Sequence, residues 1–110
     1  LIDLYPTMLE MCDLPPNKKN EGMSLVPLLR DPSKEWRFAI LTTYARENHS
    51  LRSEHYRYLR LEDGAEEFYD HKNDPNEWNN LAGEKQYKKI IEEHAEWMPK
   101  TNATPFENLR

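Results

Sequence analysis

Apolar side chains near the start of the chain recur at the spacing of an amphipathic helix. The set consists of Leu1, Leu4, Met8 and Met11, widened by Tyr5, Leu9 and Cys12. This stripe predicts a helix with one buried face. Pro6 fits if Asp3 is the N-cap, because the third helical residue has no intrahelical acceptor for a backbone N–H. The two prolines after Leu14 end the helix, and Asp13 is expected to take the left-handed conformation there.

A second apolar cluster, residues 25–29, predicts a short helical turn capped by Ser24. Residues 36–44 then alternate between two faces, which predicts a strand with one face well buried. Three more short strands are predicted over residues 49–52, 55–61 and 65–70. Because the connections are only a few residues long, consecutive strands must be antiparallel.

Residues 84–98 form the last periodic segment. One helical stripe holds Tyr87, Ile90, Ile91, His94 and Trp97. This stripe predicts a helix packed on the sheet. We therefore expect an α+β fold, with a small antiparallel sheet of about four strands and flanking helices. Its expected parts are a helical lead-in over residues 1–34, the sheet and the turn after it over 35–82, the helix over 83–98 and a tail over 99–110.

The segment after the last predicted strand begins a helix by its sequence. Asp74 is a favoured N-cap residue, and proline, here Pro75, is favoured at the first helical position. Glu77 would then stabilise the positive helix end. We predict a short helical turn from which Trp78 inserts into the sheet.

Composition limits the partners of the chain. Its 110 residues suffice for one modest core, but with 37% hydrophobic and 32% charged residues the apolar supply is thin, so a neighbouring surface is expected to complete the core. The net charge of -5, without a basic stripe, argues against nucleic acid. No apolar stretch approaches the roughly 20 residues of a membrane span. The amphipathic start without an initiating Met suggests a piece of a longer protein.

Few side chains offer chemistry of their own. Cys12 is the only cysteine, so no internal disulfide can form, and on an apolar helix face it is expected to be a core residue. The histidines lack the close pairing typical of zinc ligands, and the acidic residues do not follow a calcium-loop pattern. No metal or catalytic residue is therefore predicted in this chain.

One polar loop between two predicted strands is rich in hydrogen-bond donors. Arg46 and Arg52 suit sulfate or carboxylate oxygens, and Asn48 and His49 suit sugar hydroxyls. These four are the candidate substrate-binding residues, with a solvated loop as the alternative. Asn48 and Asn102 also begin N-x-[ST] glycosylation patterns, and a glycan on Asn48 would compete with a substrate role.

The run from His55 to Ala82 resembles the C-terminal signature of the formylglycine-dependent sulfatase family, which includes iduronate-2-sulfatase-like and choline-sulfatase-like enzymes. It combines an arginine-tyrosine strand, an acidic-glycine turn, a strand that ends in FYD where the family has LYD, and a tail of the form DP.E..NLA. The earlier segments DLYPTML and EGMSLVPLL are similar to segments that precede the C-terminal sheet of sulfatases. Asp13 departs from the family's usual Gly, which concerns the helix cap more than function.

The resemblance implies the C-terminal subdomain of an alkaline-phosphatase-like α/β sulfatase that hydrolyses sulfate esters of a sugar or polysaccharide. Such an enzyme uses calcium and a formylglycine made from a C-x-P-S-R-type motif, which is absent here, so the piece alone is predicted to be inactive. Its expected partners are the N-terminal catalytic domain and, through it, a sulfated carbohydrate, in a secreted, periplasmic or lysosomal protein. Alternatives are a free-standing protein-binding module without enzymatic activity and a phosphohydrolase of the same superfamily.

Overall fold

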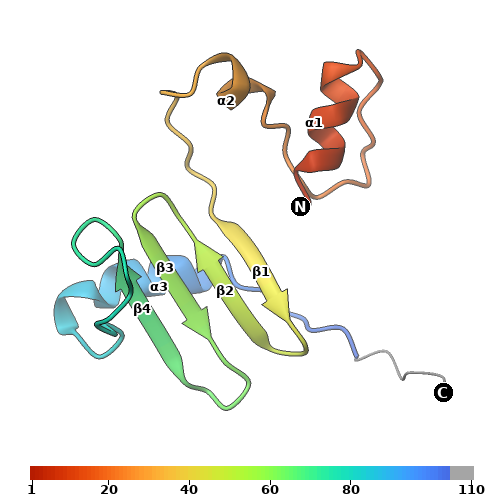
Figure 1. Cartoon of the computed structure of the whole chain (residues 1–110). Coiled ribbons are helices and arrows are strands. Elements are labelled where there is room, and N and C mark those ends of the chain that lie inside the picture. The colour runs from red at the N-terminus through yellow and green to blue at the C-terminus, as the bar shows by residue number, and fades with distance from the viewer. Residues whose placement is uncertain (105–110) are drawn as a thin grey trace. The chain divides into compact units, whose positions relative to one another are not determined.

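The structure is a computed structural model that describes residues 1–104 of the chain. The chain divides into two compact units, unit 1 (Leu1–Trp36) and unit 2 (Arg37–Arg110). Unit 1 contains the helices α1 (Leu4–Met11) and α2 (Val26–Arg30), as Figure 1 shows. No helix in the described part of the chain has the length and apolar character needed to cross a bilayer.

Polar bonds tie α1 to the segment that leads into α2. The helix begins after Asp3 as predicted, but the Asp3 carboxylate does not cap it, because Oδ1 accepts a hydrogen bond from the N–H of Met23 at 2.7 Å. The buried Thr7 donates to the Asp3 carbonyl at 2.6 Å and accepts from the N–H of Leu25 at 2.9 Å. The helix ends before Asp13, whose φ of 53° confirms the predicted left-handed residue.

The approach of this segment to the start of α1 requires glycine at position 22. A Cβ on Gly22 would lie 2.2 Å from the carbonyl oxygen of Ile2, well inside van der Waals contact. The second helix begins one residue later than predicted, with Leu25 as its N-cap, and Ser24 Oγ accepts from the N–H of Val26 at 3.2 Å. Ser24 therefore forms a side-chain turn just before α2 and is not its N-cap residue.

Unit 1 buries little apolar surface. Val26 is its buried hydrophobic residue. The apolar residues Leu4, Tyr5, Met8 and Met11 are each more than half exposed. Cys12 is exposed too, so the prediction that it is a core residue is wrong for the described residues. The apolar stripe of α1 exists, but the residues of unit 1 leave it uncovered.

Unit 2 is built on a four-stranded antiparallel sheet with the order β1-β2-β3-β4. The strands are β1 (Ile40–Tyr44), β2 (Asn48–Arg52), β3 (Tyr56–Arg60) and β4 (Glu66–Asp70). Each strand pairs with the next one along the chain, as the short connections require. Gly64 turns the β3–β4 hairpin with a φ of 83°, a conformation that strains other residues. The expected α+β fold with about four antiparallel strands is confirmed.

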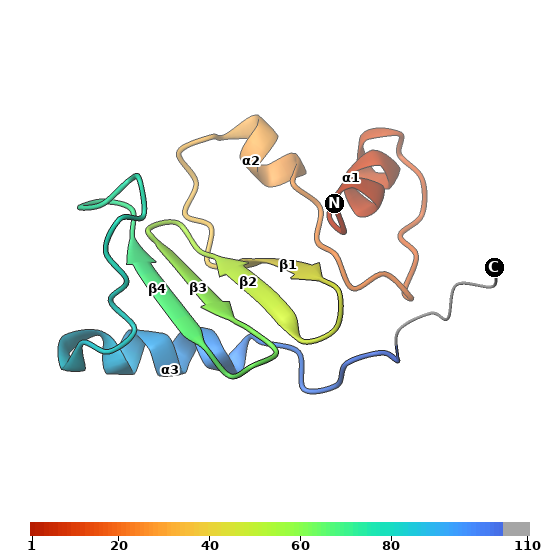
Figure 2. The ribbon, with the colours of Figure 1, turned by 60° about the horizontal axis from the view of Figure 1, so that its bottom comes forward.

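The core lies on one face of the sheet. Leu51, Tyr58 and Phe68 are aligned across β2, β3 and β4, and each is at most 1% exposed. The short turn η1 (Lys85–Tyr87) and helix α3 (Lys88–Glu96) cover this face, as Figure 2 shows. Their packing residues are Tyr87, Ile90, Ile91 and Ala95, followed by the buried Met98. The prediction of a C-terminal helix on the sheet is confirmed.

The first strand differs from its prediction. Alternation over residues 36–44 predicted one well-buried face, but β1 begins only at Ile40 and all five of its residues are exposed. The row of core side chains starts at Leu51 on β2, so the edge strand lies beyond the apolar cluster. Ahead of the strand, the ring of Phe38 lies 6.3 Å from that of Trp97.

A side chain closes the opposite edge of the sheet. Asn80 Oδ1 accepts from the N–H of Phe68 at 3.0 Å, and Asn80 Nδ2 donates to the carbonyl of Glu66 at 3.1 Å. The N–H of Leu81 donates to the carbonyl of Phe68 at 2.8 Å. These bonds occupy outward backbone groups of β4 that a further strand would otherwise use.

Candidate functional site

Two of the four candidate residues lie at the β1–β2 connection, Arg46 in the turn itself and Asn48 as the first residue of β2. Arg46 Nε lies 3.1 Å from Glu47 Oε1, and 48% of the Arg46 side chain is exposed. Both neighbours of Arg46 have positive φ, 53° at Ala45 and 65° at Glu47. Asn48 holds this turn, because its Nδ2 donates to the carbonyl of Arg46 at 3.0 Å and its Oδ1 accepts from the N–H of Glu62 at 3.3 Å. The guanidinium is accessible, whereas the amide is engaged.

His49 is engaged inside unit 2. It is 3% exposed, and its ring nitrogens Nδ1 and Nε2 lie 2.9 Å from Thr43 Oγ1 and 2.8 Å from Asn102 Oδ1. Through Asn102 the beginning of the predicted tail is fixed to the sheet, and residues 105–110 of that tail lie outside the described residues. In this segment His49 acts as an internal polar link, which the local sequence did not reveal because Asn102 is 53 positions away.

Arg52 lies on the other side of the sheet. Side chains alternate along a strand, so His49 and Leu51 face α3 while Arg52 points to the opposite face, called here the open face. Its Nη1 lies 2.9 Å from Nε2 of His71. The four candidates therefore do not converge on one site in this segment.

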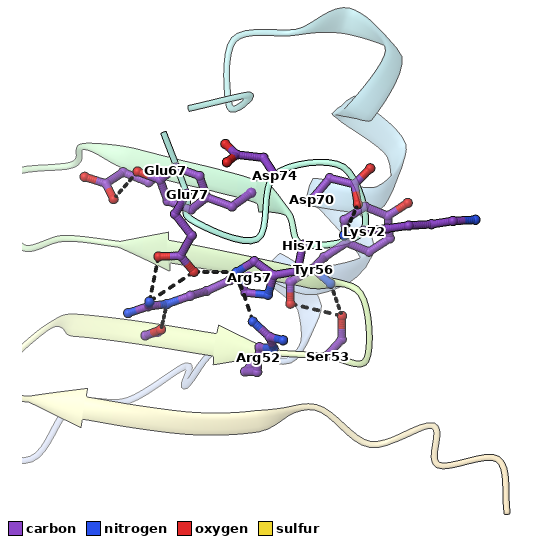
Figure 3. Close-up of polar contacts among 12 residues, drawn as sticks. Arg52, Ser53, Tyr56, Arg57, Glu67, Asp70, His71, Lys72, Asp74 and Glu77 are labelled. Carbon is purple, nitrogen blue, oxygen red and sulfur yellow. Dashed lines mark hydrogen bonds and ion pairs between the residues drawn. The ribbon is translucent and has the colours of Figure 1, made fainter. Parts of the chain in front are cut away.

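A polar network lies on the open face beside Arg52, as Figure 3 shows. Both carboxylate oxygens of Glu77 accept from Arg57 Nη1, at 2.8 and 3.1 Å. Glu77 Oε1 also lies 2.5 Å from His71 Nε2. Arg57 Nε donates to Ser50 Oγ at 3.0 Å, so the network reaches from β2 across β3 to the loop after β4. Our sequence reasoning missed this network, although the acidic residue of the DP.E signature supplies its centre.

The loop after β4 is a turn and not the predicted helix. Asp74 Oδ2 accepts from the N–H of Asn79 at 2.8 Å, and this backbone bond is the main reason that the pKa of Asp74 is lowered. Glu77 has a φ of 57° and donates its N–H to the carbonyl of Asp74 at 3.2 Å. Its carboxylate reaches Arg57 from this position. Trp78 is 80% exposed, so the prediction that it inserts into the sheet is wrong.

Comparison with known proteins explains this signature. Residues 1–104 match the family described as N-sulphoglucosamine sulphohydrolase, C-terminal. The chain belongs to the sulfatase family. A sulfatase from Formosa agariphila is 41% identical over 104 residues, which cover 94% of this chain and 20% of that protein. A Δ4,5-hexuronate-2-O-sulfatase from Bacteroides thetaiotaomicron is 34% identical over 105 residues, which cover 84% of this chain and 21% of that protein.

Solved structures agree with the sequence relatives. The structure of a 2-O GAG sulfatase matches with a TM-score of 0.73 and 31% identity, covering 86% of this chain and 22% of that one. This sulfatase segment thus spans about a fifth of the length of its relatives and corresponds to their C-terminal part. The family resemblance seen in the sequence is confirmed, and the alternative of a free-standing binding module is not supported.

Other signature residues of the sulfatase segment are structural. The buried Asp70 accepts from the N–H of Lys72 at 3.0 Å and from Asn73 Nδ2 at 2.7 Å, which shapes the turn. On β3, the Tyr58 hydroxyl donates to the carboxylate of Glu66. Burial and, second, this hydrogen bond raise the pKa of Tyr58 to about 12, so its hydroxyl stays protonated at neutral pH.

Residues 1–104 offer neither a metal site nor the sulfatase nucleophile motif. Among residues 1–104, no group of three or more His, Cys, Asp or Glu side chains is placed to hold a metal ion. Cys12 is followed by Asp13, Leu14 and two prolines, which does not match the C-x-P-S-R-type motif. The described residues therefore do not fit calcium or formylglycine.

Proposed function

We propose that the protein containing this sulfatase segment hydrolyses sulfate esters of a sugar or polysaccharide. The match of residues 1–104 to a sulfatase C-terminal family carries the proposal. Relatives named for a hexuronate and for a GAG support a uronate-containing glycan as the substrate. Because such glycans are largely extracellular polymers, a secreted, periplasmic or lysosomal location is part of the proposal.

The reacting groups belong, in this proposal, to parts of the protein outside these residues. Formylglycine would supply the nucleophile and calcium would stabilise charge on the sulfate oxygens. Since the described residues fit neither group, no step of the reaction is assigned to them. The segment serves the enzyme by packing and by contact with substrate.

The packing partner proposed for unit 1 is the N-terminal catalytic domain. Leu4, Met8 and Met11 lie one helical turn apart on α1 and are each more than half exposed. Full burial of one such side chain stabilises by roughly 1.5–3 kcal/mol. A partner surface on this stripe would supply the core that unit 1 lacks.

On the substrate side, the geometry favours the two arginines among the four candidates. Arg46 and Arg52 are exposed and present guanidinium groups that suit sulfate or carboxylate oxygens. Asn48 and His49 already bond to groups of the fold. We therefore propose that the arginines contact substrate and that Asn48 and His49 hold the strand and turn that carry them.

Turnover by the full-length protein tests this function. The complete coding region should be expressed with formylglycine formation verified by mass spectrometry, and sulfate release measured on unsaturated uronate 2-sulfate disaccharides and on 4-nitrophenyl sulfate. We expect release from at least one disaccharide. A matched variant in which the formylglycine precursor is Ala should be inactive. A fully converted protein that releases no sulfate from these substrates contradicts the proposal.

A further inference from the structure

The register of the sheet places two arginines directly opposite each other. Arg52 of β2 pairs with Arg57 of β3, and like charges at opposed positions destabilise a sheet. Glu77 neutralises one of them, because both its oxygens bond to Arg57. Within residues 1–104, the polar side-chain contact of Arg52 is His71 Nε2, and Arg52 forms no ion pair with a carboxylate. The Arg52 cluster, defined as Arg52, Arg57, His71 and Glu77, thus holds two cations and one anion beside an imidazole.

One nitrogen of His71 faces two groups with opposite requirements. Nε2 lies 2.5 Å from Glu77 Oε1 and 2.9 Å from Arg52 Nη1. A ring nitrogen of imidazole either donates or accepts a hydrogen bond. The ionised carboxylate of Glu77, held by Arg57, can only accept, so Nε2 must carry the proton and donate to it. The same nitrogen then cannot accept from Arg52.

Arg52 is therefore left with an N–H that has no acceptor. Its side chain is exposed, while the neighbouring His71 side chain is only 11% exposed and is fixed by Glu77. His71 Nδ1 is buried without a hydrogen-bond partner among the described residues, so the ring depends on Glu77 for its orientation. The ring forms a fixed side wall for a guanidinium whose planar N–H pair matches two oxygens of one anion.

We propose that Arg52, positioned by His71 and Glu77, binds an anionic group of the substrate that does not react, either a uronate carboxylate or a second sulfate. The inference rests on the proposed sulfatase function. Because the groups that act on the reacting sulfate lie outside this segment, a cation supplied here determines which sugar is accepted. His71 is a positioning residue in this proposal, and Arg52 makes the contact.

Substrate-dependent kinetics of the full-length protein test the proposal. Arg52→Gln should raise KM for the sulfated uronate disaccharide roughly 10- to 100-fold while kcat changes by less than about threefold. The same variant should hydrolyse 4-nitrophenyl sulfate with unchanged kcat and KM, because this substrate has no second anion. Lys89→Gln is the matched control, because it removes one exposed positive charge from α3, on the other face of the sheet. It should change the kinetics for neither substrate.

Two further comparisons separate positioning from mere stability and carboxylate from sulfate. His71→Ala should reproduce part of the Arg52→Gln effect, and His71→Gln, whose amide can donate near the position of Nε2, should restore most of the affinity. If the uronate carboxylate is the group that Arg52 binds, reducing it to an alcohol should weaken binding of the disaccharide to the wild type and not to Arg52→Gln. An equal further loss in both proteins assigns the contact to a second sulfate.

The two proposals fail in different ways. An active wild type whose Arg52→Gln variant handles the disaccharide normally, or loses both substrates equally, overturns the role of Arg52 and leaves the sulfatase function intact. A converted wild type without any sulfatase activity overturns the function itself. Urea midpoints of each variant, compared with that of Lys89→Gln, establish that the kinetics refer to folded protein.

Discussion

Replacement of Glu77 tests the central ion pair and the backbone of the turn together. Three variants separate these contributions. Glu77→Gln keeps the shape of the side chain and removes its charge, and Glu77→Ala removes the side chain beyond Cβ. Glu77→Gly also removes Cβ and with it the strain of the left-handed backbone. The wild-type residue bonds to Arg57 at 2.8 and 3.1 Å and to His71 at 2.5 Å, with a φ of 57°. Each variant therefore changes a defined part of this geometry.

The expected magnitudes follow from exposure and conformation. Hydrogen bonds to charged groups stabilise by about 1.5–3 kcal/mol, but Arg57 is 37% exposed, so solvent reduces the loss in Glu77→Gln to about 2 kcal/mol. A left-handed backbone costs a residue with a Cβ about 1 kcal/mol. Glu77→Gly should therefore be more stable than Glu77→Ala by about 1 kcal/mol, the reverse of the usual order.

Urea titration of the 110-residue chain, in an osmolyte that preserves the native baseline, measures these free energies. Glu92 in α3 is the matched control, because there the alanine variant should be the more stable by about 1 kcal/mol. High salt should shrink the Glu77→Gln loss. The reasoning is refuted if Glu77→Ala equals or exceeds Glu77→Gly in stability, or if Glu77→Gln matches the wild type at low salt.

Three other predictions concern unit 2 and the isolated chain. Phe68→Ala should cost about 3–5 kcal/mol because Phe68 is 0% exposed, whereas Trp78→Ala should change stability by less than about 0.5 kcal/mol; equal urea midpoints would contradict this. The raised pKa of Tyr58, about 12, means that its stabilising contribution is complete below the usual value of 10.0 and is lost as pH rises from there through about 12. Ultraviolet titration should show this late step, and Tyr58→Phe should abolish it; persistence of the step would assign it to another tyrosine. The isolated chain should be marginally stable or self-associating, and a monomer with a cooperative transition of about 8 kcal/mol or more by urea would count against that expectation.

Local patterns sufficed to predict the elements whose partners are near in sequence. The three hairpin connections and the stripe of α3 depend on spacing alone, and β2, β3, β4 and α3 appear where expected. Edge exposure of β1 was not predictable, because alternation does not say whether a helix extends beneath a given strand. The strand at Ile40–Tyr44 has the right pattern without the burial.

The candidate site was harder to predict because its contacts cross the sheet or join distant positions. Asp74 and Pro75 carry ordinary helix-start signals, yet the turn serves to bring Glu77 to Arg57, 20 positions earlier. Trp78 consequently remains in solvent. His49 looked like a loop residue because its partner Asn102 is invisible to a local pattern.

The amide of Asn80 bonds to β4 as a peptide group of another strand would, and together with the N–H of Leu81 it blocks growth of the sheet on that side. Propagation of a sheet through successive copies needs two edges on each copy, here those of β1 and β4. Because the outward groups of β4 at Glu66 and Phe68 are already bonded, edge pairing of this sheet alone cannot build a continuous fibril.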